Sequence, residues 1–163
     1  MITIRKAIEA DAKQIWQILK TTNSGGDSFP FLAEKDLEEK EMMNYWLAND
    51  KHTYVAIEDE TILGSLYLKD NQPGRGSHIA NAAYTVSEKS RGKGVGKLMG
   101  NFSLKEAKHL GYKAIQFNLV VKTNQAAVNL WKSIGFEIVG EIPEAFQHKE
   151  FGFVNAYILY QKL

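Results

Sequence analysis

The most informative stretch of this chain is "SEKSRGKGVGKLMG", residues 87 to 100. Within it, positions 91 to 97 carry three glycines and three basic side chains, between a strand-like run and a helix-like run. Glycines allow the backbone to approach a ligand without Cβ clashes. The first N–H groups of a helix have no intrahelical partner and attract anions. The stretch therefore predicts a loop at the start of a helix that binds a phosphate group.

Two familiar phosphate-binding patterns fit this stretch poorly. A P-loop needs a hydroxyl residue after its Gly-Lys pair and a glycine at its first position, but Leu98 follows Lys97 and Arg91 holds the first position. A dinucleotide-binding fingerprint needs a third glycine where this chain has Met99. That fingerprint also follows its strand directly, whereas five polar or charged residues separate Val86 from the first glycine here.

The pattern that fits is Arg-x-x-Gly-x-Gly at a helix start, formed by Arg91, Gly94 and Gly96. In this pattern the backbone N–H groups hold a pyrophosphate, and Lys93 and Lys97 add positive charge near it. A solvated glycine-rich loop ahead of an amphipathic helix is the alternative for this stretch taken alone.

A second motif lies downstream, in "NQAAVNLWKSIGF", residues 124 to 136. Together with the glycine loop it resembles the GCN5-related N-acetyltransferase (GNAT) family, whose acetyl-CoA loop has the signature Gln/Arg-x-x-Gly-x-Gly/Ala. The family's downstream pattern is matched at Asn124, Ala127, Leu130, Lys132, Gly135 and Phe136. The two motifs stand in the family's order, about thirty residues apart. The order of predicted elements also fits, so the resemblance covers essentially the whole chain.

Hydrophobic periodicity and turn residues predict an α/β (α+β) protein with helices covering a largely antiparallel sheet. The resemblance implies the GNAT fold, a mixed sheet of about seven strands, splayed at strands 4 and 5, with about four helices. Without a linker or repeat, residues 1–163 are expected to form a single acyl-CoA N-acetyltransferase domain. The predicted strands are 2–7, 52–59, 61–70, 78–87, 113–121, 137–142 and 153–163, and the helices are 9–22, 33–50, one from the glycine loop to Gly111, and 123–136.

Composition excludes several classes of function. The chain has no cysteine, so disulfides, thiolate nucleophiles and cysteine metal sites are excluded, and we expect no metal. The formal net charge of +1 provides no global field for nucleic acid or an acidic membrane. No apolar run reaches membrane-spanning length, and the charged start does not fit a secretory signal. We therefore expect a cytoplasmic protein that binds neither nucleic acid nor membrane.

The resemblance implies acetyl-CoA as the co-substrate. In the family, the strand before the loop separates from its neighbour, and the pantetheine arm lies in the gap and pairs with the strand backbone. Here that strand end is Tyr84–Val86, and residues 92–97 are expected to hold the pyrophosphate. The residues that the resemblance assigns to acetyl-CoA are Tyr84, Thr85, Val86, Arg91, Gly92, Lys93, Gly94, Val95, Gly96, Lys97, Asn124, Trp131 and Lys132.

Two departures from the family concern proton transfer. Many members place a tyrosine, which protonates the leaving thiolate, where this chain has Trp131, and an indole cannot deliver a proton at neutral pH. Trp131 can instead pack against the cofactor, while the thiolate leaves without an acid or another tyrosine serves: Tyr84, Tyr112 or Tyr157. Many members also carry a glutamate on the separated strands, but residues 78–86 and 113–121 contain no acidic residue.

Those strands offer asparagines instead. Asn81, Asn118 and Asn124 resemble the set in a subgroup that includes the yeast-type acetyltransferases acting on proline and its ring analogues. The resemblance implies that Asn81 and Asn124 are catalytic and that Asn81 and Asn118 bind the substrate, since an amide can accept from an amine and donate to a carboxylate or oxyanion. Asn124 can also be a plain helix N-cap. Asn118 can serve only to tie the separated strands together.

Two loops are expected to border the acceptor pocket. Residues 25–31 contain Phe31 and residues 143–152 contain Phe146, and we assign both phenylalanines to the substrate site. Both loops combine glycine with aromatic side chains, as lids often do; surface loops with anchoring aromatics are the alternative. Neither loop has the acidic cluster expected for polyamine or aminoglycoside recognition, which favours a small amine or an amino acid.

The predicted function is direct transfer of an acetyl group from acetyl-CoA to the amine of a small molecule, an amino acid or amino-acid analogue, through a tetrahedral intermediate. Strand amides near Val86, with Asn81, are expected to hold the developing oxyanion. Two alternatives stay open: a CoA-binding sensor or interaction module that keeps the fold, and a protein N-terminal acetyltransferase. Relatives are often homodimers, so we expect a homodimer by analogy.

Overall fold

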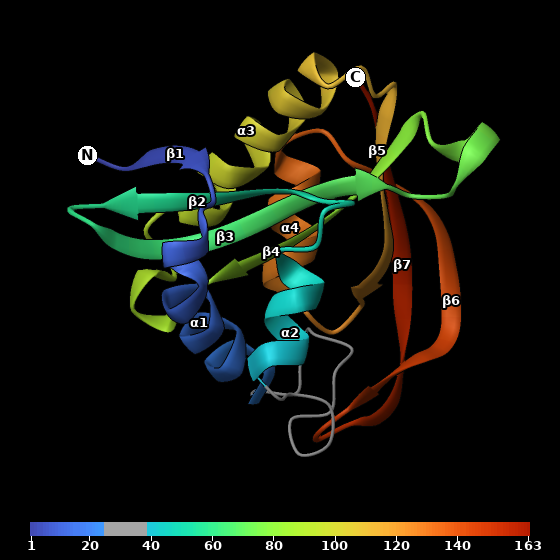
Figure 1. The fold of residues 1–163 in the computed structure, drawn as a ribbon. Coiled ribbons are helices and arrows are strands. Elements are labelled where there is room, and N and C mark those ends of the chain that lie inside the picture. The colour runs from blue at the N-terminus through green and yellow to red at the C-terminus, as the bar shows by residue number, and fades with distance from the viewer. Residues whose placement is uncertain (25–38) are drawn as a thin grey trace.

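Seven strands form one sheet in the order β1-β2-β3-β4-β5-β7-β6 in the computed structural model, which describes residues 1–24 and 39–163 (Figure 1). All neighbouring strands are antiparallel except β4 and β5, which are parallel. The predicted α+β class and the mixed, mostly antiparallel sheet are confirmed. The strands are β1 (Thr3–Lys6), β2 (His52–Glu58), β3 (Thr61–Asp70), β4 (Ile79–Val86), β5 (Ala114–Val121), β6 (Glu137–His148) and β7 (Gly152–Lys162).

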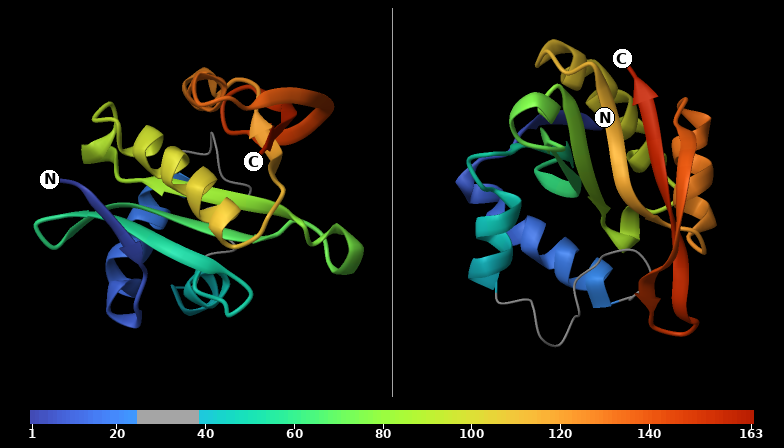
Figure 2. Two further views of the ribbon diagram at one scale, coloured as in Figure 1. Left: turned by 90° about the horizontal axis from the view of Figure 1, so that it is seen from above. Right: turned by 90° about the vertical axis from the view of Figure 1, so that its right-hand side faces the viewer.

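Helices cover both faces of the sheet (Figure 2). On one face lie α1 (Ala12–Ser24) and α2 (Glu39–Trp46), and on the other lie α3 (Val95–His109) and α4 (Gln125–Ser133). The described residues also contain three short 3-10 helices: η1 (Glu9–Asp11), η2 (Gly74–Gly76) and η3 (Glu88–Ser90). Within residues 1–24 and 39–163, no helix combines the length and hydrophobicity needed to cross a membrane.

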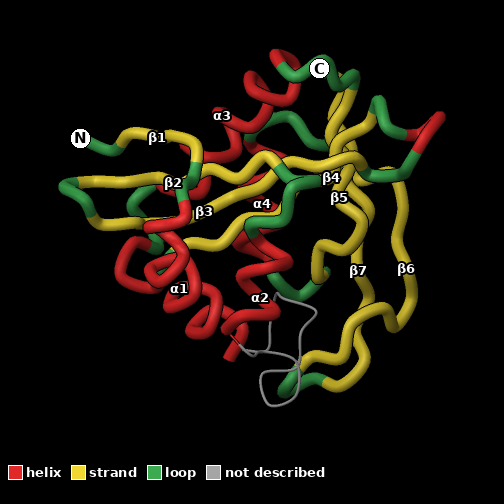
Figure 3. The backbone as a smooth tube through the Cα atoms, in the orientation of Figure 1, coloured by secondary structure: helices red, strands yellow, loops and turns green. Residues whose placement is uncertain are grey.

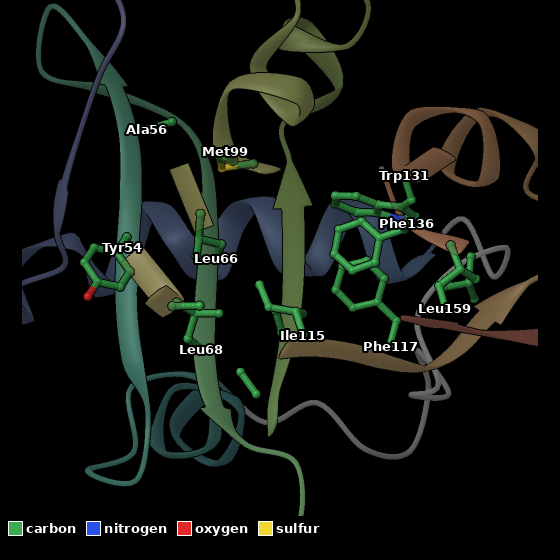
Figure 4. Close-up of a cluster of buried hydrophobic side chains, with 14 of the residues drawn as sticks. Tyr54, Ala56, Leu66, Leu68, Met99, Ile115, Phe117, Trp131, Phe136 and Leu159 are labelled. Carbon is green, nitrogen blue, oxygen red and sulfur yellow. The ribbon is translucent and has the colours of Figure 1, made fainter. Parts of the chain in front are cut away.

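Two apolar clusters hold these layers together. Under α1 and α2, Trp46 is fully buried and donates its indole N–H to Ser65 Oγ at 2.9 Å, which fixes α2 on β3. On the other face, Met99 of α3 and Trp131 of α4 pack over the central strands (Figure 4). Burying a large apolar side chain contributes about 1.5–3 kcal/mol, so the amphipathic helices are held on the sheet by packing.

Several predicted boundaries are confirmed, and each has a local cause. The β2–β3 hairpin turns at Asp59 and Glu60, both of which have positive φ angles of 47° and 64° as a tight two-residue turn requires. Gly111 follows the end of α3 and Gly135 follows the end of α4, also with positive φ angles.

The predictions differ from the structure in two places. Of the helix predicted over 33–50, the structure shows α2 over residues 39–46; the prediction is wrong for residues 47–50, which are not helical, and positions 33–38 lie outside the described residues. The loop predicted over 143–152 is wrong, because β6 continues to His148 and the turn is confined to residues 149–151 (Figure 3). Pro143 had indicated a loop, but it lies on an edge strand at a register shift, where the missing N–H is tolerated.

The feature that positions the site is the short contact between β4 and β5. These strands pair only at Ile79–Ala114 and Ala80–Ile115. Beyond Ala80 each strand keeps its other neighbour, since β4 remains paired with β3 and β5 with β7. The predicted splay at strands 4 and 5 is confirmed, and it opens the sheet toward the glycine loop.

We expect the stability of the segment that joins β1 to α1 to depend on pH through the carboxylate of Asp11. Its carboxylate, 5% exposed, accepts two bonds from Arg5 at 2.7 and 2.8 Å and one from the Ile8 amide at 2.8 Å. The bonds from Arg5, with a smaller effect from Ile8, lower the pKa of Asp11 below its usual value. A lowered folded pKa gives stability that is present above the unfolded pKa and is lost as pH falls through the folded pKa.

Asp11→Asn should therefore lower the free energy of unfolding by about 1–2 kcal/mol near neutral pH, and the deficit should shrink as pH falls below about 4. Urea denaturation at several pH values measures this difference. The control is Glu9→Gln, which removes an exposed carboxylate from the same short helix. A deficit of equal size at pH 3 and pH 7 would contradict the assignment.

Candidate active site

A cavity of about 550 Å³ occupies the gap between β4 and β5 and reaches both faces of the sheet. Its size suits a small-molecule ligand. The β4 residues that line it run from Asn81 to Val86, and the β5 residues run from Phe117 to Val121. The remaining lining residues come from α1, α2, β3, the loop after β3, the glycine loop and α4: Thr22, Tyr45, Tyr67, Lys69, Asn71, Arg91, Gly96, Asn124, Ala127, Leu130 and Trp131.

Strand alternation determines which β4 backbone groups face this gap. The Ile79 carbonyl accepts from the Asn71 amide, and the Ser87 amide donates to the Leu63 carbonyl, so odd-numbered residues of β4 bond toward β3. The β3–β4 register has no irregularity between them. Backbone groups of the even-numbered residues after Ala80, namely Ala82, Tyr84 and Val86, therefore point toward the gap without a sheet partner.

The start of α3 supplies a second set of backbone donors. Lys93 donates to the Ser90 carbonyl and Leu98 begins the helical ladder by donating to the Gly94 carbonyl. Within the described parts of the chain, five amides of this segment donate to no acceptor: those of Gly92, Gly94, Val95, Gly96 and Lys97. This set fits an anionic phosphate group, because free amides and the positive end of a helix dipole converge there.

The three glycines of this loop serve different purposes. Gly92 and Gly94 have φ angles of 75° and 79°, which residues with a Cβ rarely adopt. Gly96 has an ordinary φ, but a Cβ there would lie 3.1 Å from Leu130 Cδ2, so its absence lets α3 pack closely on α4. The loop thus combines an unusual backbone path with a tight contact between the helices that flank the cavity.

The side chains of the loop point in different directions. Arg91 is exposed and lines the cavity, whereas Lys93 and Lys97 are exposed outside its lining. Val95 is 1% exposed and belongs to the core, so its backbone amide is the part that a ligand can reach. Lys132 is exposed on α4 and does not line the cavity.

An aromatic wall closes the α3–α4 side of the cavity. Trp131 lies 4.6 Å from Tyr84 between ring centroids. Trp131 also lies 4.8 Å from Phe117, which stacks on Phe136 at 4.4 Å; these three rings are drawn in Figure 4. Trp131 is 7% exposed and faces both this cluster and the cavity. Its packing role is therefore shown, while a contact with the cofactor stays a prediction.

Tyr84 is a poor candidate for the missing acid. Ser103 Oγ donates its single hydrogen to the Gly100 carbonyl at 2.8 Å, so the 2.7 Å contact between Tyr84 and Ser103 has the phenol as donor. Burial raises the pKa of Tyr84 well above its usual value. The phenol therefore stays protonated, and its proton is already committed to Ser103.

Two of the predicted asparagines, Asn81 and Asn118, lie near the point where the strands separate. Asn81 Nδ2 donates to the Gln116 carbonyl at 3.0 Å and so bridges β4 to β5. Asn118 Nδ2 donates to Asn71 Oδ1 at 2.7 Å, and its Oδ1 accepts from the Gln116 side chain at 3.0 Å. Asn81 thus ties the separated strands, whereas Asn118 ties β5 to the loop after β3, and both line the cavity.

Asn124 caps α4. Its Oδ1 accepts from the Ala127 amide at 3.1 Å, as an N-cap does. Asn124 also lines the cavity, so its side-chain amide lies close to the space that a ligand would occupy. The predicted cap is confirmed, and the predicted catalytic role stays a prediction.

Of the two phenylalanines assigned to the substrate site, Phe146 is described by the structure and is not brought to the cavity. Phe31 lies outside the described residues. Phe146 is 7% exposed, pairs with Val154 in the β6–β7 hairpin and does not line the cavity. Its apparent loop context had suggested a lid, but the strand assignment removes that reason.

Five lining residues lie outside both the two sequence motifs and the separated strands: Thr22, Tyr45, Tyr67, Lys69 and Asn71. They come from α1, α2, β3 and the loop after β3, none of which carries a recognisable functional motif. A weak signal existed for two of them, because Tyr67 and Lys69 alternate on one face of an otherwise apolar strand. Only the arrangement of the strands shows that this face borders the gap.

A family model described as "Acetyltransferase (GNAT) family" matches residues 12–136. The chain belongs to the GNAT family of acetyltransferases. The predicted family, fold and class of enzyme are thereby confirmed at the level of the family, with acetyl-CoA as co-substrate.

Individual relatives support the same assignment. A solved GCN5-related N-acetyltransferase from Kribbella flavida is 35% identical, with a TM-score of 0.94 over 99% of this chain and 98% of that chain. N-acetyltransferase aca1 of Schizosaccharomyces pombe is 41% identical over 99 residues, which are 60% of this chain and 47% of that protein. This GNAT chain thus spans about half the length of that curated relative.

A third similar protein has been solved with a bound ligand. A GNAT superfamily phosphinothricin acetyltransferase from Sinorhizobium meliloti, solved in complex with AcCoA, has a TM-score of 0.87 and covers 99% of this chain and 88% of that chain. At 20% identity it shows the shared fold alone. In the described parts of this chain, no group of three or more His, Asp or Glu side chains could hold a metal ion.

We expect Asn124 substitutions to separate the cap from any ligand role. Asn124→Ala should destabilise the protein by about 1 kcal/mol, whereas Asn124→Asp keeps a capping oxygen and should stay near the wild type. Chemical denaturation measures both values. If the amide nitrogen also acts on a ligand, both variants lose turnover; full turnover in Asn124→Asp would leave the cap as its only role.

Proposed function

We propose that this GNAT chain transfers the acetyl group of acetyl-CoA directly to the amine of a small molecule, an amino acid or amino-acid analogue. The observation that carries the proposal is the continuous cavity, which joins the free amides at the start of α3 to a pocket of neutral amide side chains. The 41% identical stretch of a yeast protein named an N-acetyltransferase supports the reaction class. Domain extent 1–163 and homodimer formation stay predictions.

The residues that would hold acetyl-CoA follow from the two donor sets. The free amides between Gly92 and Lys97, with the Arg91 guanidinium, suit the diphosphate. The gap-facing backbone of Ala82, Tyr84 and Val86 suits the amides of the pantetheine arm as an added strand would. When bound, acetyl-CoA supplies an activated thioester carbonyl at the end of that arm.

The chain's own groups then position the acceptor and stabilise charge. Gap-facing β4 amides can donate to the negative charge that develops on the acetyl oxygen. One hydrogen of Asn81 Nδ2 is bonded to the Gln116 carbonyl, which orients the side chain, and we assign its Oδ1 the role of accepting a hydrogen bond from the amine. Holding both reactants in one gap supplies much of the rate increase.

Among the described residues that line the cavity, none is an aspartate or a glutamate. Trp131 cannot deliver a proton and the Tyr84 proton is held by Ser103. We therefore propose that the amine attacks in its neutral form, that the nitrogen of the tetrahedral intermediate releases its proton to water, and that the thiolate, whose thiol pKa is about 8–9, leaves without a dedicated acid as the C–S bond breaks.

Reversing the charge of the loop should weaken cofactor binding. In Arg91→Glu/Lys93→Glu, two exposed cations become anions, so CoA affinity measured by calorimetry should fall at least about tenfold while stability is retained. The matched control is Lys105→Glu/Lys108→Glu, the same change on exposed positions in the later turns of α3. Equal affinity in both double variants would refute the loop assignment.

Thiol release from acetyl-CoA with a panel of amino acids, simple amines and N-terminal peptides tests the proposed function. We expect turnover with small amino acids, with kcat/KM rising with pH as the free amine becomes neutral, and a lower rate in Asn81→Ala. Turnover confined to peptides would indicate a protein N-terminal acetyltransferase. CoA binding without turnover on any acceptor would favour a sensor.

A further inference from the structure

We propose that Lys69 binds the carboxylate of the acceptor, which makes the enzyme selective for amino acids over amines that lack a carboxylate. This inference rests on the proposed function and names the residue that sets its substrate class. Lys69 is partly buried, lines the cavity, and forms no hydrogen bond or ion pair within the described residues.

The register of the sheet places Lys69 beside the asparagine assigned to the amine. Lys69 is directly opposite Asn81 in the antiparallel β3–β4 pair, so the two side chains leave the same face of the sheet as neighbours. That face is the one covered by α1 and α2. Thr85 lies four residues after Asn81 on β4, so the two side chains share a face, and Thr85 is hydrogen-bonded to Thr22 of α1 at 3.1 Å.

Tyr84 and Trp131 lie on the opposite face, toward α3 and α4. The cavity therefore has one compartment beside the glycine loop and another under α1 and α2. Val86 pairs with Gly64 and Asn81 with Lys69, five β3 positions apart, which corresponds to about 17 Å along the strand. Lys69 therefore lies in the compartment under α1 and α2, away from the expected diphosphate site.

The charges of the cavity point to an anionic acceptor. Arg91 and Lys69 are the charged side chains in the described lining, and both are positive. The carboxylate of Asp70, the next residue along β3, does not neutralise Lys69. Asp70 lies on the other face of the strand, where it accepts a hydrogen bond from the Tyr112 hydroxyl at 2.8 Å. A partly buried ammonium without a partner favours a ligand carboxylate.

The neighbouring amides complete a site for an amine and a carboxylate on one carbon. Asn71 Oδ1 accepts from Asn118, and the Asn71 Nδ2 group, with no bond within the described residues, is a second donor for the carboxylate. Asn81 must turn its Nδ2 toward the Gln116 carbonyl, which leaves Oδ1 as the acceptor for the amine.

The test compares amino acids with their carboxamides, which keep the amine and lose the negative charge. In Lys69→Met, kcat/KM for the amino acid should fall on the order of 10- to 100-fold, with little change for the carboxamide and for CoA affinity. Lys69→Arg, which keeps the charge, should retain most of the preference. Equal losses on both acceptors, or no loss, would overturn the inference.

A binding measurement separates this inference from the proposed function. Calorimetry on the CoA complex compares N-acetyl amino acids with the corresponding N-acetyl amino-acid amides. Selective binding of the carboxylate form that disappears in Lys69→Met supports the role of Lys69 even where no acceptor is turned over and the proposed function fails. Turnover by the wild type with no preference for the carboxylate form leaves the proposed function standing and overturns the role of Lys69.

Discussion

The structure depends on one constraint, the two-residue contact between β4 and β5. A longer parallel ladder would satisfy the backbone groups of Ala82, Tyr84 and Val86 within the sheet and leave no room for a ligand. Unpaired backbone groups are costly when buried, so such an opening persists only if other contacts hold the strands apart and a partner satisfies them. Asn81 bonded to Gln116 sets where the separation begins, and the aromatic wall around Trp131 keeps the two strands from closing.

The glycine loop is coupled to this opening through packing. Gly96 allows α3 to lie against Leu130 of α4, and α4 carries both Trp131 and the cap Asn124 at the edge of the cavity. The free amides and the separated strands therefore belong to one rigid arrangement, in which the donors at the helix start and the gap-facing amides keep a fixed spacing. A ligand that spans both sets meets preorganised donors, which lowers the entropy cost of binding.

Local patterns predicted the parts of the site that lie on one segment. The loop from Arg91 to Lys97, the cap at Asn124 and the turn at Asp59 each follow from a few neighbouring residues whose backbone needs are specific. Tyr45, Tyr67 and Lys69 were missed because their role depends on which strands are neighbours. The end of β6 was mispredicted because Pro143 indicates a loop unless the strand is known to be an edge.

The same arrangement bears on how the acceptor amine loses its proton. A free amino acid keeps its ammonium partly because its own carboxylate lies next to it. If Lys69 takes that carboxylate, the negative charge no longer favours the ammonium, and the described lining offers no other carboxylate to replace it. Asn81 Oδ1 can still accept a hydrogen bond from the neutral amine. On this account the binding of the carboxylate itself favours the nucleophilic form of the amine, without a glutamate among the described residues that line the cavity.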